Sequence, residues 1–131
     1  MTSKRVLRVA EAMRRELGFI LDRKLGDPKI GMVTITRLEV SDDLRHAKVY
    51  VSFLGGLGGS DSLKRLRHAG RFLRGELAHT LNLRVVPRLA FILDESAENY
   101  IRIAEVLKAI EQEEGGSDGP DEAEEGLEGE D

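Results

Sequence analysis

The sequence predicts an α+β fold, a single domain in which helices cover one face of a small sheet. Three observations support this prediction. Two long segments carry apolar residues at steps of three and four, the spacing of one helix face. Two shorter segments between them are rich in β-branched residues or alternate apolar with polar ones, as strands do. The chain has 131 residues, enough for one domain, and glycine or proline separates most segments.

The first helix is expected over residues 4–25. Its apolar residues fall on one helical stripe, and several arginines lie off that stripe. Pro28 disfavours helical backbone at the residue before it, so the helix should end near Gly26. The stripe consists of Val6, Val9, Ala10, Met13, Leu17, Ile20 and Leu21, and the arginines are Arg5, Arg8, Arg14 and Arg15.

Two strands should follow as an antiparallel hairpin. Residues 32–40 are rich in valine, isoleucine and threonine, and residues 41–46 have the composition of a turn. In the second strand one set of apolar residues alternates with polar ones, which predicts a single buried face. The apolar set is Ala47, Val49, Val51 and Phe53.

The segment 63–82 carries two neighbouring helical stripes, one apolar and one basic. Asp61 or Ser62 is expected to cap its start, and Asn82 to end it. Glycine at position 70 costs about 1 kcal/mol relative to alanine in a helix, so we expect an interhelical kink at Ala69-Gly70-Arg71. The apolar stripe is Leu63, Leu66, Ala69, Leu73, Leu77 and Leu81, and the basic stripe is Lys64, Arg67, His68, Arg71 and Arg74.

A glycine-rich loop at residues 55–60 precedes this segment. It joins a strand to a helix, as phosphate-binding loops do, but it matches neither the P-loop nor the dinucleotide fingerprint. It also satisfies the G-x-x-G clamp of one class of RNA-binding domain, although that clamp joins two helices. A flexible connection is the expectation.

A third strand is expected from about residue 84 to residue 93. Pro87 stands near its start, which is tolerable because proline is confined to strand beginnings and sheet edges. Residues 96–112 show helical spacing, for example at Ile101 and Leu107. The predicted order is therefore helix, strand, strand, kinked helix pair, strand, helix.

The net charge of −4 hides a strong asymmetry. Ten of the 24 acidic residues lie in residues 113–131, which contain no lysine or arginine, so residues 1–112 hold 20 basic against 14 acidic residues. The tail has almost no large apolar side chains, and we expect it to be disordered. The predicted organisation is one domain over residues 1–112 and a disordered acidic tail over 113–131. This tail is either a solubilising extension or a competitor of RNA for the basic surface.

Catalysis is not expected. Without cysteine the chain has neither disulfides nor a thiolate metal site. The histidines match no metal-ligand spacing, and the paired carboxylates stand where turns and helix caps use them. These residues are His46, His68 and His79, with Asp42-Asp43 and Asp94-Glu95. We expect a monomer that is not an enzyme and has no cofactor, catalytic residue or metal. No apolar run approaches a membrane span, so the cytoplasm is the expected compartment.

The surplus positive charge needs a location, and the stretch 64–74 contains no carboxylate to neutralise it. Cations along one face fit a phosphate backbone, while an ordinary solvated helix face is the alternative. Only Tyr50 and Phe72 are available to stack on bases, so we expect phosphate and shape recognition of structured RNA. The candidate RNA-binding residues are Arg5, Arg8, Arg45, Lys48, Lys64, Arg67, His68, Arg71, Arg74, Arg84 and Arg88.

Short motifs occur in a characteristic order along residues 4–112. In that order and spacing the chain resembles the ribosome-binding factor A family, bacterial assembly factors of the small ribosomal subunit. The motifs are Arg5-Val6, Arg14-Arg15-Glu16-Leu17, Asp27-Pro28, Val33-Thr34-Ile35-Thr36, Val40-Ser41-Asp42-Asp43-Leu44, Ala47-Lys48-Val49-Tyr50-Val51, and Leu83-Arg84-Val85-Val86-Pro87-Arg88-Leu89-Ala90-Phe91 with Asp94.

The resemblance implies a KH-like fold of the type II order, α-β-β-α-kink-α-β, followed here by a C-terminal helix. The family carries an interhelical kink of the form Ala-x-Gly, whereas this chain has Arg71 at the glycine position and Gly70 one residue earlier. The resemblance also implies binding to the small (30S) subunit and its 16S rRNA during late maturation, including processing of the precursor ends, without catalysis. The acidic tail is not part of the family pattern.

The leading hypothesis is a non-enzymatic RNA-binding factor for assembly of the small ribosomal subunit. Such a factor needs only a different affinity for two RNA states. A non-ribosomal RNA-binding protein, or a protein-interaction adaptor that uses the same basic face on an acidic partner, is the alternative.

Overall fold

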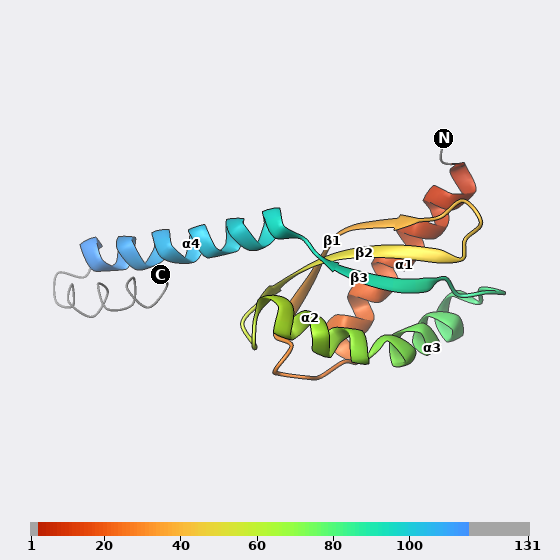
Figure 1. Ribbon diagram of the computed structural model, residues 1–131, viewed down its shortest axis with the longest axis horizontal. Coiled ribbons are helices and arrows are strands. Elements are labelled where there is room, and N and C mark those ends of the chain that lie inside the picture. Colours follow the sequence, from red (N-terminus) through yellow and green to blue (C-terminus); the bar gives the residue numbers. More distant parts are fainter. Residues whose placement is uncertain (1–2, 116–131) are drawn as a thin grey trace. The chain divides into compact units, whose positions relative to one another are not determined.

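The computed structural model describes residues 3–115. The predicted order of elements is confirmed (Figure 1). Residues up to Glu95 form one compact unit, and the last helix belongs to a second. The elements are α1 (Lys4–Arg23), β1 (Met32–Val40), β2 (His46–Leu54), α2 (Gly59–His68), α3 (Gly70–Leu81), β3 (Arg88–Leu93) and α4 (Glu95–Gly115).

Helix α1 begins at a side-chain cap. The Ser3 hydroxyl oxygen accepts a hydrogen bond from the backbone N–H of Val6 at 3.2 Å, which satisfies one of the free N–H groups of the first turn. The helix ends at Arg23, two residues before the predicted end. The predicted apolar stripe is confirmed, because Val6, Met13, Leu17, Ile20 and Leu21 are buried and Val9 and Ala10 pack against the same core.

The predicted antiparallel hairpin of β1 and β2 is confirmed, with one irregularity. Ile35 pairs with Val51 and Arg37 pairs with Tyr50, so Thr36 is an extra residue that makes a bulge in β1. Strand β3 lies parallel to β2, and the sheet order is β1-β2-β3. A parallel pair requires a crossover, and α2 and α3 make it.

The core lies on one face of the sheet, as predicted. Ala47, Val49, Val51 and Phe53 of β2 are buried, whereas Lys48 between them is exposed. Helix α1 contacts β1, α2 contacts β2 and β3, and α1 packs on α3. Figure 1 shows α1 crossing behind the sheet, with α2 and α3 running below β3.

The glycine-rich loop is packed tightly against a second loop, so the expectation of a flexible connection is wrong. The backbone N–H of Leu57 donates to the Lys29 carbonyl at 2.7 Å. A side chain at Gly56 would lie 2.5 Å from that carbonyl oxygen, and one at Gly31 would lie 2.7 Å from Gly55. The two loops therefore approach so closely that both positions require glycine.

The predicted cap of α2 is also wrong. The N-cap is Gly58, which makes no side-chain cap, and the helix begins at Gly59. The Ser62 hydroxyl is fully buried, accepts a hydrogen bond from the Gly58 N–H at 2.8 Å and donates to the Lys29 carbonyl at 3.5 Å. Ser62 thus ties the two loops together from inside the first turn of α2.

The predicted helix break falls at Ala69, between α2 and α3. Ala69 has φ −85° and ψ 2°, outside the helical region, and its N–H donates to Leu66 at 3.0 Å in a tighter turn. Helix α3 ends at Asn82, as predicted, with left-handed backbone at φ 52°. Gly70 does not have a positive φ, and a side chain there would meet no atom within 4 Å.

We therefore expect Gly70→Ala to fold normally and to be more stable by about 0.5–1 kcal/mol, because alanine restricts the unfolded chain more than glycine does. Urea unfolding followed by circular dichroism measures this difference. A loss of stability would show that the break depends on glycine at position 70 instead of on Ala69.

The predicted start of β3 near residue 84 is wrong, since the strand begins at Arg88. Pro87 is buried and has no N–H to donate to the sheet. The Arg88 N–H is the first that bonds to the hairpin, donating to the Arg45 carbonyl at 2.8 Å. Residues 83–87 form a connection that leads from α3 into the sheet.

Helix α4 confirms the predicted C-terminal helix and continues to Gly115. The acidic tail lies mostly outside the described residues, so its disorder, its competition with RNA and the boundary after residue 112 stay predictions. Within residues 3–115, no helix is long and apolar enough to cross a membrane.

Candidate RNA interface

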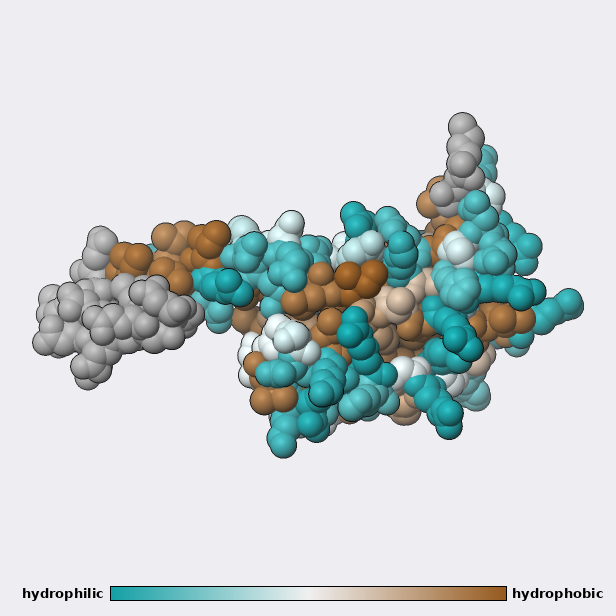
Figure 2. Space-filling model, in the orientation of Figure 1, coloured by the Kyte–Doolittle hydropathy of each residue, from teal (hydrophilic) through white to brown (hydrophobic). Residues whose placement is uncertain are grey.

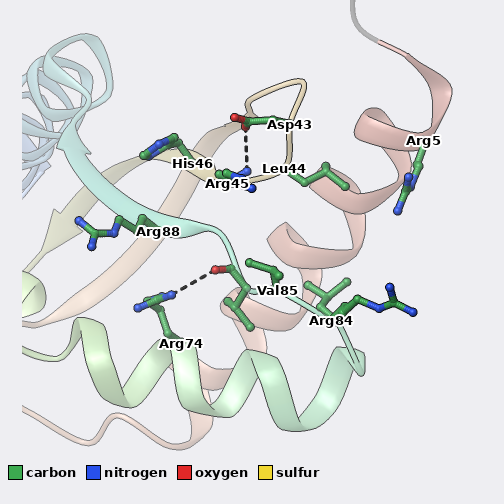
Figure 3. Close-up of a pocket in the computed structure, with 11 residues that line it drawn as sticks. Arg5, Asp43, Leu44, Arg45, His46, Arg74, Arg84, Val85 and Arg88 are labelled. Carbon is green, nitrogen blue, oxygen red and sulfur yellow. Dashed lines mark hydrogen bonds between the residues drawn. The ribbon is translucent and has the colours of Figure 1, made fainter.

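The eleven predicted RNA-binding residues are all exposed, but they do not form one face. Five of them surround one hollow of about 670 Å³ (Figure 3). They come from α1, from the turn between β1 and β2, from α3, from the connection after it and from β3. These five residues are Arg5, Arg45, Arg74, Arg84 and Arg88, and we call their surroundings the arginine hollow.

The turn between β1 and β2 places Arg45. The Asp43 carboxylate accepts hydrogen bonds from the Ser41 hydroxyl at 2.6 Å and from the Arg45 backbone N–H at 3.0 Å. The hydrogen bond from the Ser41 hydroxyl has the largest effect on the pKa of Asp43, and the bond from this N–H has the next largest. Both hold that pKa below its ordinary value. Asp43 also lines the hollow, so a carboxylate oxygen that could pair with an arginine there is already used by the turn.

Two arginines of the predicted basic stripe donate hydrogen bonds to β3 and to the connection that precedes it. The Arg74 guanidinium donates to the Val86 carbonyl at 3.2 Å, and the Arg67 guanidinium donates to the Phe91 carbonyl at 3.0 Å. Because β3 is an edge strand, its outward carbonyls have no strand partner. The bonds fix both guanidinium groups along this edge while the residues stay exposed. Figure 2 shows hydrophilic side chains over much of α2 and α3 in the same view.

Carboxylates pair with four of the nine arginines that lie elsewhere between residues 3 and 112. Within residues 3–112, none of the five arginines of the hollow forms an ion pair. The lining combines these five arginines with one carboxylate, that of Asp43, so its surplus positive charge is available to an anionic partner. The pairs found elsewhere are Arg14–Glu11 at 3.0 Å, Arg23–Asp22 at 3.3 Å, Arg37–Glu39 at 3.5 Å and Arg65–Asp27 at 3.1 Å.

The other predicted residues do not line this hollow. His68 lies beside a smaller hollow with Arg65 and Asp27, where the Lys29 backbone N–H and then Arg65 lower the pKa of the Asp27 carboxyl. Lys48 stands opposite Glu39 in the sheet. The remaining three are Arg8 on α1, Lys64 on α2 and Arg71 on α3.

Neither aromatic candidate for base stacking lies in the arginine hollow. The Tyr50 ring is covered by the Arg37 guanidinium, 4.1 Å from the ring centre. Phe72 is exposed on α3 but does not line the hollow. The prediction from sequence missed the apolar floor of the hollow, formed by Leu44, Leu83, Val85 and Val86.

The described residues contain no group of three or more histidine, aspartate or glutamate side chains that could hold a metal ion. The arrangement offers cations and apolar surface to a ligand, with Asp43 and His46 also in its lining.

The two-layer arrangement, with helices on one face of a β1-β2-β3 sheet and a broken helix pair between β2 and β3, defines a KH-like α+β domain. The family model described as "Ribosome-binding factor A" matches residues 5–107. The chain belongs to the ribosome-binding factor A family.

Individual relatives agree with this assignment. The ribosome-binding factor A of Desulfitobacterium hafniense is 42% identical over 115 residues, covering 87% of this chain and 92% of that protein. The crystal structure of the Thermus thermophilus factor has a TM-score of 0.60 at 26% identity, over 67% of this chain and 93% of that one. A homology model of the Thermus thermophilus factor, fitted into a cryo-EM map of a 30S–RbfA complex, has a TM-score of 0.59 at 26% identity, with the same coverage.

Proposed function

We propose that this protein binds the small ribosomal subunit and its 16S rRNA and promotes late maturation of the subunit, including processing of the rRNA precursor ends. The observation that carries the proposal is the arginine hollow, where five arginines from separate elements meet without an ion-pair partner within residues 3–112. Family membership supports the same proposal, as does the Thermus thermophilus relative fitted into a 30S complex.

The proposed mechanism is non-enzymatic and needs no cofactor. A factor that binds one rRNA conformation more tightly than another shifts the population towards the first by its difference in affinity. Arginine suits this task because its planar guanidinium binds phosphate through two parallel hydrogen bonds. We further propose that the protein acts as a cytoplasmic monomer.

The function is tested by reversing two charges of the arginine hollow. In the variant with Arg84→Glu and Arg88→Glu, co-sedimentation with free small subunits should weaken at least about tenfold, because two phosphate contacts are lost. Neither side chain has a hydrogen-bond or ion-pair partner within residues 3–112, so the fold should remain intact. Circular dichroism of the variant checks that.

The matched control reverses two arginines that have carboxylate neighbours, Arg14→Glu and Arg23→Glu, with the same change in net charge. It should co-sediment nearly as well as the unchanged protein. Equal losses in the two variants would contradict the placement of the RNA interface at the hollow.

A protein-interaction adaptor would use the same cations on an acidic protein. Nuclease treatment of an extract separates the two functions, since digestion of the RNA should release an RNA-bound protein from the ribosomal fraction. A protein that stayed with an intact protein partner after digestion would support the adaptor.

A further inference from the structure

The floor of the arginine hollow is apolar, which contact with a paired RNA helix does not require. Leu44, Leu83, Val85 and Val86 line it, and Val85 is 63% exposed. The bases of a duplex are stacked inside the helix, so its backbone offers phosphates and ribose hydroxyls to a protein surface. An apolar floor below the cations therefore indicates a ligand that also has an exposed apolar face.

The cations surround this floor from more than one side. In Figure 3, Arg5 and Arg84 lie on one side of Val85 and Arg88 lies on the other, with Arg45 above. A ligand resting on Val85 would have guanidinium groups on both flanks. This arrangement fits an apolar group whose attached chain carries an anion on either side.

Two residues with left-handed backbone lie at the hollow or beside it. Leu44 with φ 62° and Asn82 with φ 52° are the two non-glycine residues between positions 3 and 112 that have left-handed backbone. Leu44 lines the hollow, and Asn82 directly precedes Leu83 of its floor. Left-handed backbone is unfavourable for leucine and persists where surrounding contacts hold it. Strain of this kind concentrates at binding sites.

Hydrogen bonds, one of them within the turn itself, hold both segments. The Leu44 N–H donates to the Ser41 carbonyl at 2.9 Å, and the Arg74 guanidinium binds the connection at Val86. The Arg88 N–H joins the turn to β3. The floor is thus set in place before any ligand arrives, as expected of a formed binding pocket.

We propose that the arginine hollow holds one unpaired nucleotide of the RNA, with its base on Val85 and Leu44 and its neighbouring phosphates on the flanking arginines. The proposal rests on the proposed function and adds to it a preference for RNA with an unpaired residue at the contact. An extruded base supplies the apolar face, and the sugar–phosphate backbone on either side supplies the two anions.

Two RNA hairpins test this proposal, one fully paired and one identical except for a single bulged 2-aminopurine nucleotide. The full-length protein should bind the bulged hairpin about tenfold more tightly at the same salt concentration, and the 2-aminopurine fluorescence should change on binding. Val85→Ser, which keeps the charge and changes an exposed position, should reduce this preference to less than about twofold. It should leave the affinity for the paired hairpin unchanged.

Leu57→Ser is the matched control, since Leu57 is similarly exposed but lies in the glycine-rich loop, outside the lining of the hollow. It should keep the full preference. Equal affinity of the unchanged protein for the two hairpins would overturn the nucleotide pocket and leave the proposed function standing. If neither hairpin bound, the proposed function would fail with it. A Val85→Ser variant that lost affinity for both hairpins equally would also overturn the pocket.

Discussion

Replacing Gly56 with alanine should destabilise the protein by about 3 kcal/mol or more. The new methyl group would lie 2.5 Å from the Lys29 carbonyl oxygen and 2.6 Å from the Gly31 nitrogen, and all the atoms it meets belong to the backbone. These atoms cannot rotate away as the end of a side chain can. The residue also has φ 64°, which is unfavourable for alanine. Urea unfolding gives the free energy difference.

Gly55→Ala is the matched control for this experiment. Gly55 also has a positive φ, of 77°, but a side chain there would meet no atom within 4 Å. It should cost only the backbone strain, about 1–2 kcal/mol. The difference between the two variants isolates the close approach of the loops. Equal losses would mean that the loops are not interlocked.

Affinity for rRNA should fall about 100- to 500-fold between 50 and 200 mM salt if all five arginines of the hollow contact phosphates. Each phosphate contact releases condensed counterions, and the logarithm of affinity falls with the logarithm of salt concentration by about 0.7 to 0.9 per contact. Five contacts then give a slope near −4. Fluorescence anisotropy with labelled rRNA fragments at four or more salt concentrations measures it.

The variant with Arg84→Glu and Arg88→Glu should bring this slope to about −2, whereas Arg14→Glu with Arg23→Glu should leave it near −4. A weak slope in the unchanged protein would contradict binding through phosphates. A slope that changed equally in both variants would mean that net charge, and not the hollow, governs the affinity.

Local periodicity predicted most of the fold. The bounds of β1 are those expected, because β-branched residues fill the segment and a turn composition closes it. The apolar stripe of α1 and the break near Gly70 were also foreseen from residue spacing. These features depend on neighbours a few positions apart, which a sequence displays directly.

The errors arose where distant segments meet. Nothing around residues 55–60 shows that they pack on the loop at residues 29–31. Their glycine-rich composition therefore predicted a flexible connection, although the loop is tightly packed. Pro87 signalled an irregular strand start, but only the pairing with β2 shows that Arg88 is the first residue of β3.

The same limit applies to the candidate RNA interface. Each arginine of the hollow could be named from its charge, yet their meeting depends on the register that places Arg88 beside His46. The basic stripe crosses the predicted break, so Lys64 lies on α2 and Arg74 on α3. Leu44 and Val85 carry no signal of binding in the sequence, because a lone apolar residue in a turn or connection is common.

The parallel pairing of β2 with β3 has a consequence for the order of folding. In the hairpin Val40 pairs with Ala47, seven positions away, whereas His46 pairs with Arg88, 42 positions away. Closing the longer loop costs about 1.6 kcal/mol more in chain entropy, so β3 should dock after the hairpin has formed. The arginine hollow is completed only by that late step. A chain still in synthesis would carry the same arginines scattered along it, and would acquire its concentrated RNA-binding surface only once folding is finished.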